Sequence, residues 1–247
     1  MKSNRGQRFI GLIALLVAGV GLVPTLAAEE GAATRPAVVK VACIGDSITF
    51  GSGLEDRRKE SYPSQLQSML DERGGGKKWE VQNFGVSGST LLERGDRPYR
   101  DQKRFTAARE FAPDIVIIKL GTNDSKPQNW EHKQDFSADL TALINEFRDL
   151  PGRPTVWLCR PVPAFPGKYG IRNEVIRDQI LPVIDAVAKE QNVPVIDLYT
   201  ALSNKPQHFP DTIHPNTDGA KLIAAEIHKA LIEAATAPTA TAPAAVR

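Results

Sequence analysis

The feature that most constrains the fold is a series of short apolar runs that alternate with helix-like segments. Five runs rich in Val and Ile predict strands at Val38–Ile44, Trp79–Phe84, Asp114–Leu120, Thr155–Cys159 and Pro194–Leu198. Runs with so little polar alternation are typical of parallel strands buried on both faces. Helical patterns follow at Pro63–Arg73, Gln134–Leu150, Val175–Gln191 and Thr217–Ala234. The alternation predicts an α/β fold with one parallel sheet between two layers of helices.

The chain has 247 residues, which is enough for one such domain, and we place it at residues 38–234. Residues 29–37 (EEGAATRPA) are interpreted as a flexible lead-in. Residues 235–247 are rich in Ala, Pro and Thr, a composition that predicts a disordered tail.

The N-terminal 28 residues resemble a secretory signal peptide. Lys2, Arg5 and Arg8 precede an apolar run that ends near two small residues, Ala27 and Ala28. The alternative is a retained membrane anchor, because the run is just long enough to span a bilayer. Several Gly and Pro residues within the run favour cleavage near Ala28. We therefore expect export to the periplasm or the extracellular space, without stable membrane insertion afterwards.

The charge balance argues against a nucleic-acid partner. The whole chain carries a formal charge of +2, and removal of the three basic residues of the leader leaves −1. The modest basicity therefore belongs to the leader, and no basic patch remains for a polyanion. The oligomeric state is not predicted from the sequence.

Two cysteines, Cys43 and Cys159, lie inside predicted strands. A disulfide is possible in an exported chain, but it requires Cα atoms about 4.4–6.8 Å apart. A third strand between the two would separate them by roughly two spacings of about 4.8 Å. We expect two buried free thiols.

Polar clusters follow the strands at the points where the strands end. They are Gly45-Asp46-Ser47, the segment Asn83–Gly88, Gly121-Thr122-Asn123-Asp124 and the segment Asp211–Pro215. Ligands of doubly wound sheets bind beyond the carboxyl ends of the strands. These four clusters are therefore expected to meet at one edge of the sheet.

Ser47, His214 and Asp211 have the chemistry of an activated nucleophile. A serine hydroxyl needs a base that takes its proton and a third group that orients the base. Asp211 precedes His214 by three residues, a spacing that would place both side chains on one face of a helical turn. Ser47 stands where a strand gives way to a predicted helix start, so N–H groups would face the reacting atom.

A tetrahedral oxyanion needs hydrogen-bond donors that are already in place. We assign this task to the backbone N–H of Ser47, the backbone N–H of Gly85 and the side-chain amide of Asn123. The alternatives are purely structural roles: Gly85 and Asn123 only form turns, and Ser47 or Asp46 only caps a helix.

The polar clusters contain four short motifs: GDSIT at 45–49, NFGVSG with Gly85, GTND at 121–124 and DTIHP at 211–215. Together they resemble the four blocks of the SGNH, or GDSL, hydrolases. The resemblance covers roughly residues 39–234. It implies a three-layer, flavodoxin-like fold with strand order 2-1-3-4-5, which puts the third strand between those of Cys43 and Cys159. It also implies a catalytic triad of Ser47, His214 and Asp211 that cleaves esters or thioesters without a metal.

No cofactor is expected. No His or Cys pair has metal-ligand spacing, so no metal is expected either. The remaining histidines, at positions 132, 208 and 228, have no neighbouring Asp and Pro like those of His214, and we interpret them as structural or solvent-facing.

Three residues on loops at the strand ends are candidates for a substrate rim: Trp130, Arg160 and Tyr169. Aromatic and polar side chains at such positions suit sugar binding. The alternative for Trp130 is that it packs against the start of a helix.

The stretches GDSITFG and LGTNDSKPQNW resemble those of secreted bacterial carbohydrate O-acetylesterases, such as sialate O-acetylesterases and acetylxylan esterases. The first hypothesis is therefore removal of O-acetyl groups from carbohydrates through an acyl-enzyme. A second is a short-chain acyl esterase, thioesterase or lysophospholipase-like enzyme. A third, from another class, is a non-catalytic glycan-binding module, which the complete set of triad residues disfavours.

Overall fold

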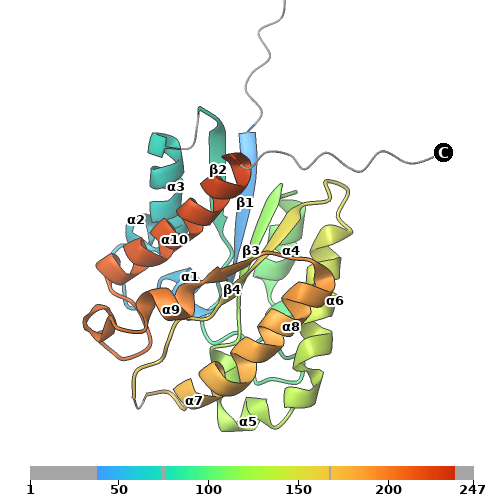
Figure 1. Ribbon diagram of the computed structural model, residues 1–247, viewed down its shortest axis with the longest axis vertical. Helices are drawn as coiled ribbons and strands as arrows, with labels where there is room; N and C mark the ends of the chain where they lie inside the picture. The colour runs from blue at the N-terminus through green and yellow to red at the C-terminus, as the bar shows by residue number, and fades with distance from the viewer. Residues whose placement is uncertain (1–37, 74–75, 167, 237–247) are drawn as a thin grey trace, which may run out of the picture. The chain divides into compact units, whose positions relative to one another are not determined.

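Five parallel strands form the sheet, and their order is β2-β1-β3-β4-β5 (Figure 1). The computed structural model describes residues 38–73, 76–166 and 168–236. The strands are β1 Val38–Gly45, β2 Lys78–Asn83, β3 Ile115–Lys119, β4 Thr155–Arg160 and β5 Val195–Asp197. Each begins or ends within one residue of its predicted bounds, and the strand order implied by the sequence resemblance is confirmed.

Side chains of successive strand residues point to opposite faces of the sheet, and each face is covered by its own helices. Ala42 and Ile44 of β1 belong to the core cluster that includes α4 (Lys103–Glu110), α6 (Phe136–Arg148) and α8 (Leu181–Gln191). Val41 and Cys43 belong to the cluster that includes α3 (Tyr62–Arg73) and α10 (Thr217–Thr236). The predicted three-layer α/β/α architecture is therefore confirmed (Figure 1).

Short helices occupy the connections, many of them at the carboxyl ends of the strands. They are α1 Ser47–Phe50, α2 Arg57–Glu60, α5 Pro127–Trp130, α7 Asn173–Val175 and α9 Leu198–Leu202. One-turn 3₁₀ segments lie at Tyr99–Asp101, Asn123–Ser125, Lys133–Asp135 and Pro206–His208.

Two helical features differ from the prediction. The helix predicted at Val175–Gln191 consists of α7, a π-helical segment Ile176–Ile180 and α8. Pro182 lacks an N–H donor, and the wider turn before it accommodates that gap in the helical ladder. Helix α4 was not predicted, because only Phe105 and Ala108 of its eight residues are buried and the apolar signal is weak.

Both cysteines are buried free thiols, as predicted. Cys43 pairs with Ile117 of β3, and Ile117 pairs in turn with Trp157 of β4, so β3 separates the strands of the two thiols. The predicted leader, lead-in and most of the predicted tail lie outside the described residues. Helix α10 continues two residues past the predicted end of the domain, to Thr236. Among the described residues, none of the helices has the length and apolar character that crossing a bilayer requires.

Candidate active site

Ser47 is the first residue of α1, directly beyond the end of β1. The Asp46 side chain caps this helix by accepting a hydrogen bond from the Ile48 N–H at 2.9 Å. Gly45 permits close packing of the end of β1 against the end of β3, since a Cβ there would lie 2.6 Å from the Lys119 carbonyl oxygen. The start of α1 presents the Ser47 side chain and its backbone N–H at the carboxyl edge of the sheet.

The side chains of Ser47, His214 and Asp211 form a continuous hydrogen-bonded chain. His214 Nε2 lies 2.8 Å from Ser47 Oγ, and His214 Nδ1 lies 2.6 Å from Asp211 Oδ2. Asp211 Oδ1 accepts the backbone N–H groups of Ile213 and His214. The arrangement fits an imidazole that takes the serine proton while the carboxylate fixes its orientation.

The turn that carries Asp211 and His214 is not helical, contrary to the prediction from their spacing. Thr212 has φ of 74°, a left-handed conformation that is rare for a β-branched residue. The Phe165 N–H donates to the Thr212 carbonyl oxygen at 2.8 Å and ties the turn to the loop after β4. A strained turn braced by a neighbouring loop, rather than a helix face, brings the two side chains together.

Asp211 is partly buried, yet it favours the charged form. Burial alone would raise its pKa, but the hydrogen bonds from the His214 ring and from two backbone N–H groups outweigh burial and lower that pKa. The carboxylate is therefore ionised at neutral pH and stabilises positive charge that develops on the imidazole.

A buried ion pair lies directly behind the nucleophile. Lys119, at the end of β3, places its Nζ 3.2 Å from Asp46 Oδ1, and neither side chain is exposed to solvent. The pair joins β3 to the residue that caps α1. It therefore fixes the position of Ser47 relative to the centre of the sheet.

Asn123 opens the 3₁₀ turn that follows β3, and it is 6% exposed. Its Nδ2 donates to the Ser89 carbonyl oxygen at 3.0 Å. The backbone carbonyl oxygen of Asn123 accepts a hydrogen bond from Asn129 Nδ2 at 2.8 Å. An amide nitrogen carries two hydrogens, so one remains for a ligand. Asn123 lines the same cavity as Ser47, a position from which it could donate to a bound ligand.

Gly85 does not reach this cavity, which corrects the prediction for the third donor. Its N–H donates to Asn83 Oδ1 at 2.9 Å, and a Cβ at this position would lie 2.3 Å from the Phe50 backbone nitrogen. Gly85 therefore serves close packing of β2 against α1. Gly88, three residues later, lines the cavity with φ of +82°. Among the hydrogen bonds of the described residues, none uses the Gly88 N–H.

Asp124 anchors the loop that positions Asn123. Its carboxylate accepts the N–H groups of Leu91 and Leu92 at 3.1 and 2.8 Å, so it holds the segment whose Ser89 carbonyl contacts Asn123. Complete burial raises the pKa of Asp124 to about 7, although these donors partly oppose the shift.

Of the three residues predicted for a substrate rim, one lines the cavity around Ser47 and two do not. Tyr169 is 61% exposed, lines the cavity, and its ring centroid lies 5.8 Å from that of His214. Trp130 is instead buried, packs on Phe136 and donates from Nε1 to Gln179. Arg160 forms ion pairs with Asp185 and Asp197 at 2.7 and 2.6 Å. The sequence does not reveal the packing of Trp130 or the ion pairs of Arg160. Neither side chain belongs to the rim.

The cavity around Ser47 has a volume of about 220 Å³. Ser52, Lys126 and Ile171 also line it and lie outside the predicted polar clusters, while Ser87, Gly88, Thr122 and Ile213 belong to those clusters but were assigned no role. Ser52 and Ser87 join two loops through a 2.7 Å hydrogen bond between their hydroxyls. In the sequence, only proximity to the predicted clusters and to Tyr169 could have pointed to Ser52, Lys126 and Ile171. Within the described part of the chain, no group of three or more His, Cys, Asp or Glu side chains is arranged to hold a metal ion.

Known proteins share the sequence family and the fold of this chain. Residues 43–222 match the GDSL-like lipase/acylhydrolase family. An acetylxylan esterase of Xylanibacter ruminicola is 41% identical over 217 residues, which cover 81% of this chain and 44% of that protein. The chain thus spans less than half of the length of this relative.

Two solved structures share the fold. A carbohydrate acetylesterase from Sinorhizobium meliloti superposes with a TM-score of 0.65 at 19% identity, over 79% of this chain and 99% of that chain. A lipase/acylhydrolase from Enterococcus faecalis superposes with a TM-score of 0.63 at 25% identity, over 79% and 96% of the two chains.

Proposed function

The chain belongs to the GDSL-like lipase/acylhydrolase family, and we propose that it is a serine ester hydrolase that removes O-acetyl groups from carbohydrates. The observation that carries the mechanism is the hydrogen-bonded chain from Ser47 Oγ through His214 to Asp211. A serine hydroxyl so placed has a base for its proton and an orienting carboxylate.

In the first half of the reaction, Ser47 Oγ attacks the acetyl carbonyl carbon while His214 Nε2 takes the hydroxyl proton. The backbone N–H groups of Ser47 and Gly88 and the Asn123 amide donate to the oxyanion that forms. His214 then returns the proton to the sugar oxygen, and the C–O bond of the ester breaks. An acetyl group is left on Ser47.

In the second half, a water molecule replaces the sugar. His214 takes a proton from this water, and the hydroxide attacks the acetyl carbonyl on Ser47. The same three donors stabilise the second oxyanion. Acetate leaves when the Ser47 oxygen recovers a proton from His214, and the free enzyme is restored.

Two observations support a short acyl group on a sugar. The cavity at Ser47 holds only about 220 Å³, and Tyr169 and Ile171 restrict it. The curated relative at 41% identity is an acetylxylan esterase, although the chain matches only 44% of its length. A small pocket with a few placed polar groups suits an acetyl ester better than a long acyl chain.

The test measures acetate release by the wild-type enzyme from acetylated xylan and O-acetyl sialic acid, and fatty-acid release from a panel of lysophospholipids. We expect release from at least one acetylated carbohydrate and no cleavage of the lipids. On p-nitrophenyl esters the rate should fall from acetate to octanoate, because the small cavity suits the shorter acyl group better. Ser47→Ala supplies the background rate for every substrate.

Cleavage of the lysophospholipids alone would contradict the carbohydrate assignment and favour the short-chain or lipid esterase alternative. Family membership and the connected Ser47–His214–Asp211 side chains argue against a non-catalytic glycan-binding module. Export remains a proposal that rests on the leader-like residues 1–28.

A further inference from the structure

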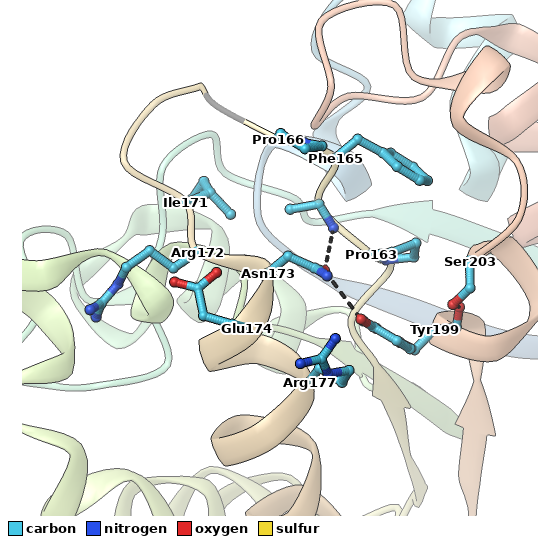
Figure 2. A pocket seen from close by; sticks show the side chains of 11 residues that line it. Pro163, Phe165, Pro166, Ile171, Arg172, Asn173, Glu174, Arg177, Tyr199 and Ser203 are labelled. Atoms are coloured by element: carbon cyan, nitrogen blue, oxygen red, sulfur yellow. Dashed lines mark hydrogen bonds between the residues drawn. The ribbon is translucent and has the colours of Figure 1, made fainter.

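A second, larger cavity lies beside the cavity that contains Ser47. It has a volume of about 580 Å³ and lies at the same edge of the sheet, between the loop after β4, the start of α7 and helix α9 (Figure 2). We call it the β4–α7 cavity. It is lined by Pro163, Ala164, Phe165, Pro166, Ile171, Arg172, Asn173, Glu174, Arg177, Tyr199 and Ser203.

The two cavities are neighbours, because Ile171 lines both of them. The residue after Ile171 is hydrogen-bonded to the 3₁₀ turn that carries Asn123, and these bonds fix the wall between the two cavities. The Arg172 N–H donates to Ser125 Oγ at 3.0 Å and Arg172 Nε donates to the Ser125 carbonyl oxygen at 2.6 Å. Ser125 ends the 3₁₀ turn that begins with Asn123. A substrate with its ester at Ser47 therefore has the β4–α7 cavity within reach of its remaining atoms.

The β4–α7 cavity combines a firm apolar wall with fixed hydrogen-bonding groups. Pro163, Phe165 and Pro166 line one side, while Asn173 and Tyr199 turn their polar ends toward each other (Figure 2). Asn173 Oδ1 accepts the Ala164 N–H at 3.0 Å and the Tyr199 hydroxyl at 3.2 Å. Both bonds use the amide oxygen. Within the described residues, none accepts a hydrogen bond from Asn173 Nδ2, which leaves two fixed donors.

The charged groups of the cavity favour a neutral ligand over an anion. Arg177 uses Nε and Nη2 on Asp178, both at 2.7 Å, and presents Nη1 as a further donor. Arg172 is engaged with Ser125, and Glu174 contributes a carboxylate that can accept hydroxyl protons. Apolar ring faces with hydroxyl groups at the rim are the chemistry of a pyranose, and they match this combination of surfaces.

We propose that the β4–α7 cavity binds the sugar units next to the acetylated one, so that the preferred substrate is an acetylated oligosaccharide and not an isolated acetylated sugar. The proposal rests on the proposed function, since it assumes that the ester cleaved at Ser47 is borne by a carbohydrate. Binding energy from the neighbouring units would raise kcat/KM for longer substrates.

The experiment compares kcat/KM for acetate release from mono-O-acetylated xylose and from acetylated xylo- and manno-oligosaccharides of two to four units. Each value is divided by kcat/KM for p-nitrophenyl acetate, which lacks neighbouring sugars. We expect this ratio to rise on the order of 10-fold with length in at least one series, as a few added hydrogen bonds would give.

The double variant Glu174→Ala/Arg177→Ala removes one acceptor and one donor from the cavity. It should lower the ratio for the longer substrate on the order of 10-fold, mainly through KM. Lys189→Ala/Glu190→Ala is the matched control, because it removes the same two charges from exposed positions of α8 outside the cavity. The control should keep the wild-type ratio. Thermal unfolding of both double variants verifies that they are folded.

The possible failures are distinguishable. If acetate is released from the acetylated sugars but neither series gains with length, the cavity proposal is wrong while the proposed function stands. The same holds if the cavity variant and the control variant keep equal ratios. If p-nitrophenyl acetate is hydrolysed and no carbohydrate ester is, the proposed function fails, and the cavity proposal fails with it.

Discussion

Gly85 and Gly88 are three residues apart, and the structure gives them different tasks. Gly85 lies against the backbone of α1, while Gly88 lines the cavity with an N–H that none of the described residues binds. Gly85→Ala should lower the free energy of unfolding by at least about 2 kcal/mol, because its Cβ would overlap backbone atoms that cannot yield. Urea unfolding measures this loss.

Gly88→Ala should instead lower kcat, because a Cβ at φ of +82° strains the loop and redirects the N–H. The strain itself costs about 1–2 kcal/mol of stability. Gly76→Ala is the matched control, since Gly76 has φ of +77° and open space around its Cβ position. A Gly88→Ala enzyme with the kcat of the Gly76→Ala control would contradict the assignment of the Gly88 N–H as an oxyanion donor.

Asp124 gives stability a pH dependence of definite sign. Its pKa is about 7 in the folded protein, above the ordinary value of 3.8. Between these values the folded protein holds a proton that the unfolded chain lacks, so raising the pH through this window destabilises the fold. From pH 5 to pH 8 the wild type should lose about 2–3 kcal/mol more than Asp124→Asn.

Urea unfolding at the two pH values measures this difference, and Asp149→Asn, which removes an exposed carboxyl group, controls for the change in charge. An equal loss in the wild type and Asp124→Asn would mean that Asp124 is already ionised at pH 5.

At the scale of elements, the Lys119–Asp46 pair joins the end of β3 to the first turn of α1. Lys119→Met leaves a buried carboxylate without its countercharge and should lower the free energy of unfolding by about 3–5 kcal/mol. The double variant Lys119→Met/Asp46→Asn should recover much of this loss, because no isolated charge remains and the Asn oxygen can still accept the Ile48 N–H. A double-mutant cycle by urea unfolding checks it. Strictly additive effects would show that the two side chains do not interact.

The elements themselves were largely predictable. Buried parallel strands have continuous apolar runs, so their bounds were found to within one residue. Helix α4 escaped prediction because two buried side chains give almost no periodic signal. The π-helical segment before Pro182 was not predicted, because the amphipathic pattern continues through the wider turn.

The site was predictable where position along the chain decides it. Ser47 and Asn123 each lie within four residues of the end of a strand, and the edge of the sheet brings them together. Side-chain direction within a loop was not predictable. Trp130 is the last residue of α5 and Arg160 is the last residue of β4. Gln179 of the π-helical segment accepts the Trp130 N–H, and Asp185 of α8 forms an ion pair with Arg160. The sequence likewise does not reveal which of Gly85 and Gly88 has a free N–H. The Asn83 side chain accepts the Gly85 N–H, so the Gly88 N–H is the one left for an oxyanion.

At the scale of the whole molecule, the sheet protects both thiols. Cys43 and Cys159 lie in the core cluster that includes α3 and α10, and burial raises the pKa of Cys159 to about 12. A thiol reagent such as dithionitrobenzoate should therefore leave the native protein unmodified and react with two thiols after unfolding in urea. Rapid reaction of either thiol without denaturant would contradict the described packing of this face.

The central claim is that the edge of the sheet activates one serine, Ser47. The most direct measurement is intact-mass spectrometry with peptide mapping after treatment with a fluorophosphonate, which forms a covalent adduct only with activated serines. We predict one adduct, on Ser47, and a loss of p-nitrophenyl acetate hydrolysis in proportion to labelling. His214→Ala should slow the labelling by about 10³-fold or more. An adduct on another residue, or full labelling of Ser47 with hydrolysis retained, would contradict the account.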